Sequence, residues 1–232
     1  MSRSAAKFSP SILIFDMDGV LVDVAGSYHA AIIATVHSFT GKRVKAAEIH
    51  QWKNQSGYND DWRLTTDWIW SLGHRISYDE VKRRFLEFYW GANGRGAMRR
   101  EKWIAPSSLL QRLGKRAELS IFTGRNWQEL KPTLERYNAR RFFRHIVTTD
   151  DVSRPKPDPE GLVRILAGRR ADTALYLGDN VDDAIAARAV GVPFIGVLPR
   201  SGPARGARLA RLQEEGAQMV IPSVRELPRL LA

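Results

Sequence analysis

The sequence contains no cysteine. Disulfide bonds, thiolate catalysis and cysteine-ligated zinc are therefore excluded, and nothing argues for an oxidising compartment. Long hydrophobic runs are missing as well. The apolar run near the N-terminus is too short for a signal peptide, and no later run approaches the length of a membrane span. We therefore expect a soluble, cytoplasmic protein with no membrane partner.

Negative charge is scarce relative to positive charge. The chain has 36 lysines and arginines against 25 aspartates and glutamates, which gives a formal net charge of +11. Such a balance invites a nucleic-acid partner or an anionic substrate. The basic clusters at 98–102, 140–141 and 205–211 are nevertheless scattered, and no nucleic-acid-binding motif accompanies them. We interpret them as solvated side chains and regard nucleic-acid binding as the weaker alternative.

One stretch organises the rest of the chain. Residues 12–15 form an apolar run that leads directly into Asp16, Asp18 and Gly19. This pattern is typical of a buried parallel strand that opens into a loop at its carboxyl end, where open α/β sheets bind ligands. Two carboxylates held so close repel each other, and a divalent cation or a shared proton relieves that repulsion.

From residue 24 to residue 104 the patterns predict helices and no strand. Apolar residues recur at helical spacing over 27–39 and over 59–72, where Asn59 is the expected N-cap. A capping box at 77–80 opens a third helix. The segment therefore differs in kind from the stretch that precedes it.

Six of the seven tryptophans fall in this helical segment. We therefore expect it to form a compact subdomain with its own aromatic core. Glycines at Gly26 and within 91–96 flank the helices and suggest hinges. The predicted division is a core of residues 1–23 and 105–232 and an inserted helical cap of residues 24–104.

After residue 105, strands alternate with helices. Apolar runs predict strands at 118–122, 145–148, 173–177, 194–197 and 218–221. Such alternation is typical of a parallel sheet covered by helices on both faces. The predicted fold class is α/β, with a Rossmann-like parallel core and an inserted all-helical cap.

Polar groups follow several of these strands, and a proline-rich loop adds a lysine. In chain order they are Asp16, Asp18, Thr123, Gly124, Lys156 and Asp179. Carboxyl ends of parallel strands share one edge of the sheet, so these groups should meet. Carboxylates can bind Mg²⁺, while a lysine, a hydroxyl and loop N–H groups can hold phosphate oxygens. One aspartate remains free to attack phosphorus.

These motifs resemble those of the haloacid dehalogenase superfamily of phosphohydrolases, subfamily IA. Residues 16–23 are similar to its first motif, Thr123 within 122–125 to its second, Lys156 to its third and 178–183 to its fourth. All four occur in the family's order and on the expected elements. The helical insertion is similar to the family's mobile C1-type cap.

The resemblance implies a nucleophile and an acid–base residue. Asp16 would form an aspartyl-phosphate, and Asp18 would protonate the leaving oxygen and then deprotonate the hydrolytic water. Thr123 and the Gly124 N–H would bind the phosphoryl group. Lys156 would keep Asp16 ionised and neutralise phosphate charge.

The resemblance also implies a bound Mg²⁺. Asp16, the main-chain carbonyl of Asp18 and Asp179 would hold the ion. Asp183 would lie in or near its coordination shell, although Asp182 competes for this role and an ordinary acid in the first turn of a helix is the alternative for Asp183. An acid at position 18 favours phosphate-ester chemistry, because the family's dehalogenases and phosphonatases lack one there.

The cap loop is expected to select the substrate. Its candidate residues are Lys53, Asn54, Gly57, Tyr58 and Asn59. Lys53 could resemble the Schiff-base lysine of phosphonatases, but with Asp18 present we interpret it as a solvated surface lysine. Likewise, His29 could face the site, although a place on the first cap helix is the simpler expectation.

The predicted function is a Mg²⁺-dependent phosphatase that hydrolyses a small organic phosphomonoester through an aspartyl-phosphate. Its partner would be a small phosphorylated metabolite, while the oligomeric state is left open. A phosphomutase of a sugar phosphate shares the same core chemistry and is the first alternative. A basic nucleic-acid-binding module with a vestigial site is the second.

Overall fold

The first strand explains how the sheet is built. The computed structural model describes residues 8–232, and β1 (Ile12–Phe15) lies at the centre of its large sheet. All four residues of β1 are fully buried. Ile12 and Ile14 face one apolar layer, whereas Leu13 and Phe15 face the other. A strand buried on both faces has no polar alternation, as its sequence predicted.

The large sheet has six parallel strands in the order β5-β4-β1-β6-β7-β8. The other five strands are β4 (Glu118–Phe122), β5 (His145–Val147), β6 (Ala174–Gly178), β7 (Phe194–Val197) and β8 (Met219–Ile221). The chain adds strands first on one side of β1 and then on the other. The strand order therefore reverses beside β1, which is where open α/β sheets form a ligand crevice.

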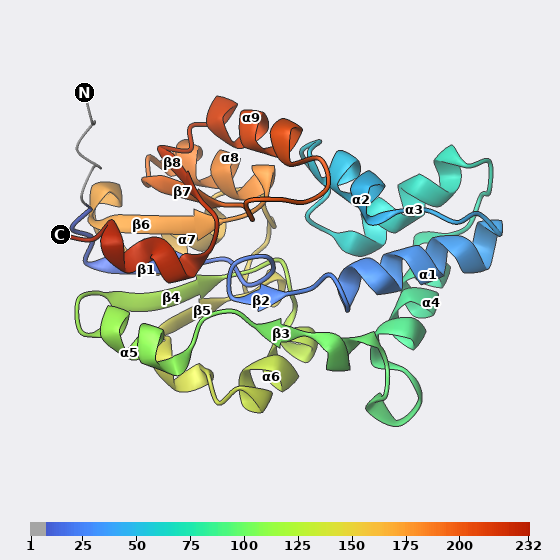
Figure 1. Cartoon of the computed structure of the whole chain (residues 1–232), viewed down its shortest axis with the longest axis horizontal. Coiled ribbons are helices and arrows are strands. Elements are labelled where there is room, and N and C mark those ends of the chain that lie inside the picture. Colours follow the sequence, from blue (N-terminus) through green and yellow to red (C-terminus); the bar gives the residue numbers. More distant parts are fainter. Residues whose placement is uncertain (1–7) are drawn as a thin grey trace.

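Helices cover both faces of this sheet (Figure 1). One face packs against α7 (Glu160–Leu166), α8 (Val181–Val190) and α9 (Arg205–Glu214). The other face packs against α5 (Ser107–Gly114), α6 (Trp127–Arg136) and the short 3₁₀ helix at Val224–Arg229. The predicted α/β class with a Rossmann-like core is confirmed.

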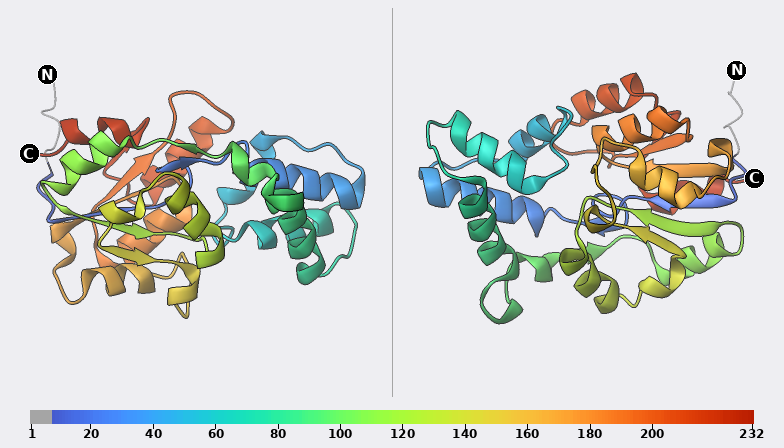
Figure 2. Two further views of the ribbon diagram at one scale, coloured as in Figure 1. Left: turned by 90° about the horizontal axis from the view of Figure 1, so that it is seen from below. Right: turned by 180° about the vertical axis from the view of Figure 1, so that it is seen from behind.

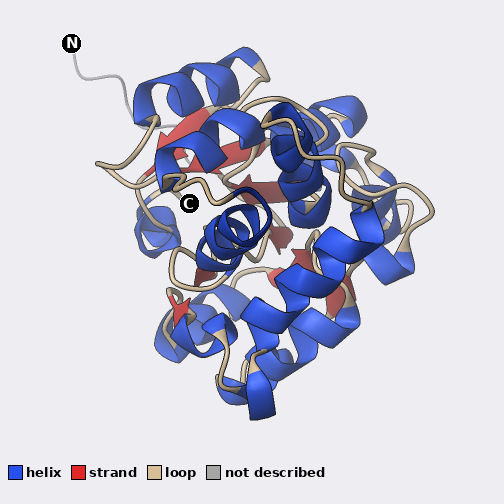
Figure 3. Cartoon of the chain, turned by 90° about the vertical axis from the view of Figure 1, so that its right-hand side faces the viewer, coloured by secondary structure: helices blue, strands red, loops and turns tan. Residues whose placement is uncertain are grey.

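Four helices form a separate lobe beyond the carboxyl ends of the strands (Figures 1 and 2). They are α1 (Tyr28–Thr40), α2 (Ala46–Lys53), α3 (Asp61–Ser71) and α4 (Tyr78–Trp90). Seen from the side of this lobe, the helices lie in front of the sheet (Figure 3), while the C-terminus lies at the opposite end of the molecule (Figure 1).

Aromatic residues fill the helical lobe, but its core is not separate from that of the sheet. Tyr28 packs against Phe85 and Tyr89 at ring-centroid distances of 6.0 and 4.6 Å. These rings belong to one apolar cluster with the α5/α6 face of the sheet, through residues 20–24. The expectation of an independent aromatic core is therefore wrong, because the crossing segment is itself apolar and buried.

The crossing between the lobes contains two short strands that the sequence did not reveal. β2 (Val22–Asp23) and β3 (Lys102–Trp103) form an antiparallel pair. The glycine run at 91–96 lies earlier, where the Gly96 N–H donates to the Trp90 carbonyl over 2.7 Å. A Cβ on Gly96 would come within 2.3 Å of the Tyr89 carbonyl oxygen. This run is a closely packed turn of the lobe in this arrangement, and a hinge there stays a prediction.

Helix starts also differ in detail from the expectation. Asp60, and not Asn59, caps α3 by accepting hydrogen bonds from the backbone of Trp62 and Arg63. Asn59 does not cap this helix and instead lies against Gly124, as described below. Within residues 8–232, no helix has the length and apolar character that crossing a membrane requires.

Candidate active site

Three neighbouring strands deliver polar side chains to the crevice beside β1. Asp16 follows β1, Thr123 follows β4 and Asp179 follows β6. Asp16 and Thr123 are 5% and 1% exposed. The Asp16 backbone N–H donates to the Leu177 carbonyl over 2.8 Å, which fixes the end of β1 against β6. The site is thus held by the sheet rather than by a flexible loop.

The acids around this point form one cluster. Carboxylate oxygens of Asp16, Asp179 and Asp183 all lie within 4.8 Å of one another. The Lys156 ammonium donates to Asp16 over 2.8 Å and to Asp183 over 2.7 Å. Burial raises the pKa of Asp16 well above its ordinary value, against the attraction of Lys156, and the other carboxylates raise it further. Burial likewise raises the pKa of Asp179 to about 6.

Such a cluster has the composition of a site for a hard cation. Its ligands are oxygen atoms only, as Mg²⁺ prefers. One lysine is shared by two of the acids, and Arg208 donates to Asp179 over 2.9 Å. Three acids crowded beside an incoming phosphate require additional positive charge, and a divalent cation would supply it.

Close backbone approach shapes this cluster. Gly19 has φ of +73°, and a Cβ there would lie 2.3 Å from Asp179 Oδ2. A Cβ on Gly178 would lie 2.4 Å from Asp183 Oδ2. Larger residues would displace the carboxylates, so the glycines of the first and fourth motifs are required by sterics.

Asp183 and Asp182 point in different directions, although they are adjacent. Asp183 accepts hydrogen bonds from the Tyr176 hydroxyl over 2.6 Å and from the Asn180 N–H over 3.1 Å, in addition to Lys156. It is both the capping acid of α8 and a member of the cluster. Asp182 instead accepts from Ser56 and Gly57 of the cap loop. The geometry therefore places Asp183, and not Asp182, beside the other acids.

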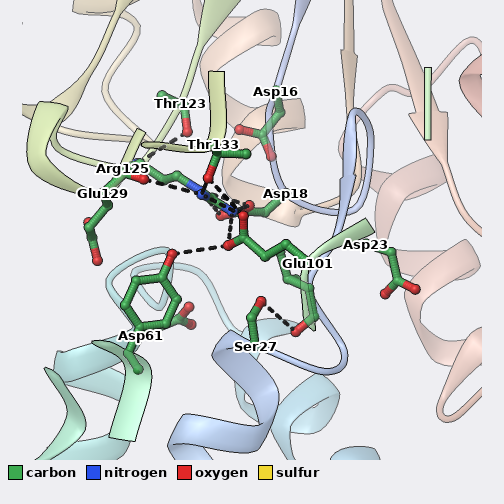
Figure 4. A network of polar contacts seen from close by, with 12 residues as sticks. Asp16, Asp18, Asp23, Ser27, Asp61, Glu101, Thr123, Arg125, Glu129 and Thr133 are labelled. Carbon is green, nitrogen blue, oxygen red and sulfur yellow. Dashed lines mark hydrogen bonds and ion pairs between the residues drawn. The ribbon is translucent and has the colours of Figure 1, made fainter. Parts of the chain in front are cut away.

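Asp18 makes a contact that sequence reasoning missed. Arg125 donates to its carboxylate over 2.6 and 3.0 Å, and to Glu101 over 2.9 Å (Figure 4). Arg125 is 2% exposed. Thr133 and Tyr89 donate to the same Glu101 carboxylate over 2.7 and 3.0 Å. A buried arginine needs such partners, because an unpaired charge is costly to bury.

This network joins the sheet to the helical lobe. Arg125 comes from the loop after β4, Glu101 from the crossing segment before β3, and Tyr89 from α4. Arg125 also lies over the Tyr28 ring at 4.9 Å from its centroid. The second motif contained the arginine, but only the fold brings Glu101 to it. A lone acid after a run of basic residues carried no signal of this pairing.

Thr123 and Gly124 lie where the second motif predicts them. The Thr123 hydroxyl accepts a hydrogen bond from the Arg125 N–H over 3.1 Å. A Cβ on Gly124 would come within 2.1 Å of Asn59 Nδ2, so the cap-loop amide rests directly on this glycine. The lobe is therefore in contact with the crevice at Gly124.

The five cap-loop candidates lie in three different places. Gly57 and Asn59 line the same cavity as Asp16 and Lys156. Asn54 lines a neighbouring cavity. Tyr58 lines neither cavity: its hydroxyl donates to Asp67 over 3.2 Å and its ring packs against Trp52. Tyr58 thus lies away from both cavities in this arrangement, and its contact with a substrate stays a prediction.

Lys53 is not a solvated surface lysine. Its ammonium forms a 2.8 Å ion pair with Asp61, and its side chain is 20% exposed. It lines both cavities, together with Asp18 and Asp179. The correction follows from tertiary packing, since α2 places Lys53 against the strand ends.

Two cavities adjoin at Asp18, Lys53 and Asp179. The catalytic cavity, of about 290 Å³, contains Asp16, Gly124 and Lys156. The neighbouring cavity, of about 420 Å³, contains none of these three residues, but His29 and His50 line it. His29 thus stands on the first helix of the lobe and also faces the neighbouring cavity. Burial lowers the pKa of His29 to about 3 and that of His50 to about 4.

A family model matches most of the chain. The chain belongs to the haloacid dehalogenase-like hydrolases, whose model matches residues 13–197. The resemblance inferred from the motifs is thereby confirmed.

Two proteins with similar sequences carry the names of enzymes. An imidazoleglycerol-phosphate dehydratase from Phytophthora nicotianae is 32% identical over 195 residues, and the match covers 80% of this chain. The chain spans 43% of the length of that protein. A phosphoglycolate phosphatase from Pseudomonas savastanoi pv. phaseolicola is 29% identical over 230 residues, which covers 94% of this chain and 78% of that protein.

Solved structures confirm the fold. A Haemophilus somnus protein, described as a predicted phosphoglycolate phosphatase, matches with a TM-score of 0.73 at 16% identity, covering 95% of this chain and 97% of that one. A Thermotoga maritima protein, assigned provisionally as a beta-phosphoglucomutase, matches with a TM-score of 0.66 at 22% identity, covering 94% and 97%. At these identities the likeness concerns the fold alone.

Proposed function

We propose that the protein is a Mg²⁺-dependent phosphatase of a small organic phosphomonoester. The observation that carries this proposal is the buried cluster in which Lys156 contacts both Asp16 and Asp183 beside Asp179. Asp16 would attack phosphorus and form an aspartyl-phosphate, which water then hydrolyses. The phosphatases among the relatives support this class of reaction.

The residues around Asp16 suit the steps that follow. Asp18 lies two residues after the nucleophile, lines the same cavity and would exchange a proton with the leaving oxygen and the attacking water. Arg125 would orient its carboxylate. Thr123, the Gly124 N–H and Lys156 would hold the phosphoryl oxygens. Asp16, the Asp18 carbonyl, Asp179 and Asp183 would hold Mg²⁺, which would offset their charge and that of the phosphate.

We also propose that residues 24–104 act as a cap over a core of 1–23 and 105–232, of which 1–7 lie outside the described residues. Contacts of Ser56 and Gly57 with Asp182, and of Asn59 with Gly124, support a closed arrangement. Closure would exclude water from the phosphoryl group. A phosphomutase would share these features, as the Thermotoga maritima fold illustrates.

The decisive experiment is phosphate release from a panel of phosphorylated metabolites, with and without Mg²⁺. We expect turnover that excess EDTA abolishes and added Mg²⁺ restores. Undiminished turnover in EDTA would refute the metal assignment. An isomer of a sugar phosphate in place of free phosphate would establish the mutase. Nucleic-acid binding in a gel-shift assay without any phosphate release would favour a nucleic-acid-binding module with a vestigial site.

A further inference from the structure

Three polar side-chain atoms, from residues that line one wall of the catalytic cavity, form no hydrogen bond of normal length among residues 8–232, although the Tyr28 hydroxyl lies close enough to Glu129 to lower its pKa. They are the Tyr28 hydroxyl, the Trp62 indole N–H and Glu129 Oε1, and we call them the cap-side wall. Tyr28 and Glu129 are only 4% and 5% exposed. Buried polar groups without partners are costly, so a cavity lined by them indicates a ligand that supplies the partners.

Each group is held firmly in place. Tyr28 is the first residue of α1, Trp62 the second of α3, and Glu129 occupies the first turn of α6. The second oxygen of Glu129 accepts the Asn126 N–H over 3.3 Å. Figure 4 shows Glu129 near Arg125, whose guanidinium group donates to the Glu129 main-chain carbonyl over 3.5 Å. The wall therefore combines one donor, one acceptor and one hydroxyl that can act as either.

Among residues 8–232, the two basic side chains that line this side of the cavity already have acidic partners. Lys53 is paired with Asp61 over 2.8 Å, and Arg125 is paired with Asp18 and Glu101. Burial raises the pKa of Glu129 to about 7, with Arg125 acting in the opposite direction. Burial and then the Glu129 carboxylate raise the pKa of Tyr28 well above its ordinary value. A second carboxylate placed here would meet this acid without a counter-charge.

We propose that the cap-side wall binds a neutral, hydroxylated leaving group. The inference rests on the proposed phosphatase function and names its substrate class. A hydroxyl can accept from Trp62 and donate to Glu129 at once. A carboxylate such as that of glycolate cannot donate, and an ammonium cannot accept. Tyr28, Trp62 and Glu129 would therefore determine specificity, and phosphoglycolate, for which several relatives are named, would be a poor substrate.

The test uses three esters that differ only at the end remote from phosphorus. They are 2-hydroxyethyl phosphate, phosphoglycolate and phosphoethanolamine, with acetyl phosphate as a reference that offers the wall little to bind. We expect kcat/KM to be at least about tenfold higher for the hydroxyethyl ester than for either charged ester. Preference for phosphoglycolate or phosphoethanolamine would overturn the proposal.

Variants of the wall make the test specific. Glu129→Gln and Trp62→Phe should each lower kcat/KM for the hydroxyethyl ester by about three- to tenfold while sparing acetyl phosphate. Glu135→Gln, an exposed acid on the same helix, is the matched control. Equal effects on both substrates in folded variants would overturn the role of the wall. If the wild-type protein hydrolyses neither the esters nor acetyl phosphate, the proposed phosphatase function itself fails.

Discussion

The two sides of the catalytic cavity differ in how their polar groups are satisfied. At the strand ends, Lys156 contacts Asp16 and Asp183, so buried charges already meet charges of opposite sign. On the cap-side wall, Trp62 and Glu129 each keep a polar atom without a partner among the described residues. Under the proposed function, the first side would act on the phosphoryl group that all phosphate esters share. The second side would be completed by the leaving group that we propose for it.

This contrast separates the residues that would act on phosphorus from the residues that would select the leaving group. Groups that act on phosphorus must be fixed before the substrate arrives, because misplacement of a reacting group is costly in rate. Groups that select a leaving group disfavour a wrong substrate, because that substrate leaves their hydrogen-bonding atoms without partners. Loss of a strand-end residue should therefore affect every substrate, whereas loss of a wall residue should change their ratio.

The largest effect is expected from Asp16→Asn. The variant lacks the nucleophile, so turnover of every ester and of acetyl phosphate should fall by about 10⁴-fold or more. Phosphate release after rigorous removal of deamidated protein is the measurement. Near-normal turnover of any ester would end the covalent mechanism. Asp172→Asn, at an exposed position, serves as control.

Lys156→Met should affect both activity and stability. It leaves Asp16 and Asp183 buried without their common cation, and breaking such a pair costs about 3–5 kcal/mol. We expect a lower free energy of unfolding by denaturant and no measurable turnover. Lys131→Met, whose side chain is 71% exposed, should change neither. A fully stable Lys156→Met protein would contradict the pairing, because the two acids would then tolerate burial alone.

Glu129→Gln should produce a pH-dependent gain in stability. Burial raises the pKa of Glu129 from 4.5 to about 7, so between these values the unfolded chain gives up its proton before the folded protein does. The wild type therefore loses stability as pH rises through this window. Glutamine does not titrate, so the variant's advantage should grow from near zero at pH 4.5 to at most about 3 kcal/mol above pH 7.

Thermal unfolding of both proteins across pH 4.5–8 measures this difference. Glu135→Gln, whose side chain is 65% exposed, supplies the control because its acid should titrate near its ordinary value in both states. An advantage that is constant with pH would mean that Glu129 is already satisfied in the folded protein. The cap-side wall would then have no unpaired acceptor at Glu129 and would not differ from the strand ends in this respect.

The smallest effects concern the cap loop. Lys53→Met should lower kcat/KM for the best ester by about tenfold and affect acetyl phosphate less, since Lys53 lines the cavity on the cap side. Tyr58→Phe should leave both rates within about twofold, because its hydroxyl contacts Asp67 instead. Steady-state rates for both substrates provide the comparison. A large loss in Tyr58→Phe would indicate another position of the loop during turnover.

The sequence by itself determined the class of fold and the strand-end residues. The apolar run that ends at Asp16 and the motifs around Thr123, Lys156 and Asp179 are local patterns: a buried strand must be apolar, and the residue after it must lie at the sheet edge. The close approach of Gly19 to Asp179 explains why a glycine is needed at that turn.

Only the tertiary structure determined which side chains contact one another. Arg125 meets Glu101, Asp182 meets the cap loop, and Tyr58 turns away from the cavity. None of these contacts follows from spacing along the chain, because each joins side chains from different elements or depends on how a loop packs. Burial decided the rest: whether Lys53 is solvated and whether Glu129 keeps an unpaired oxygen depend on what the folded lobes place around them.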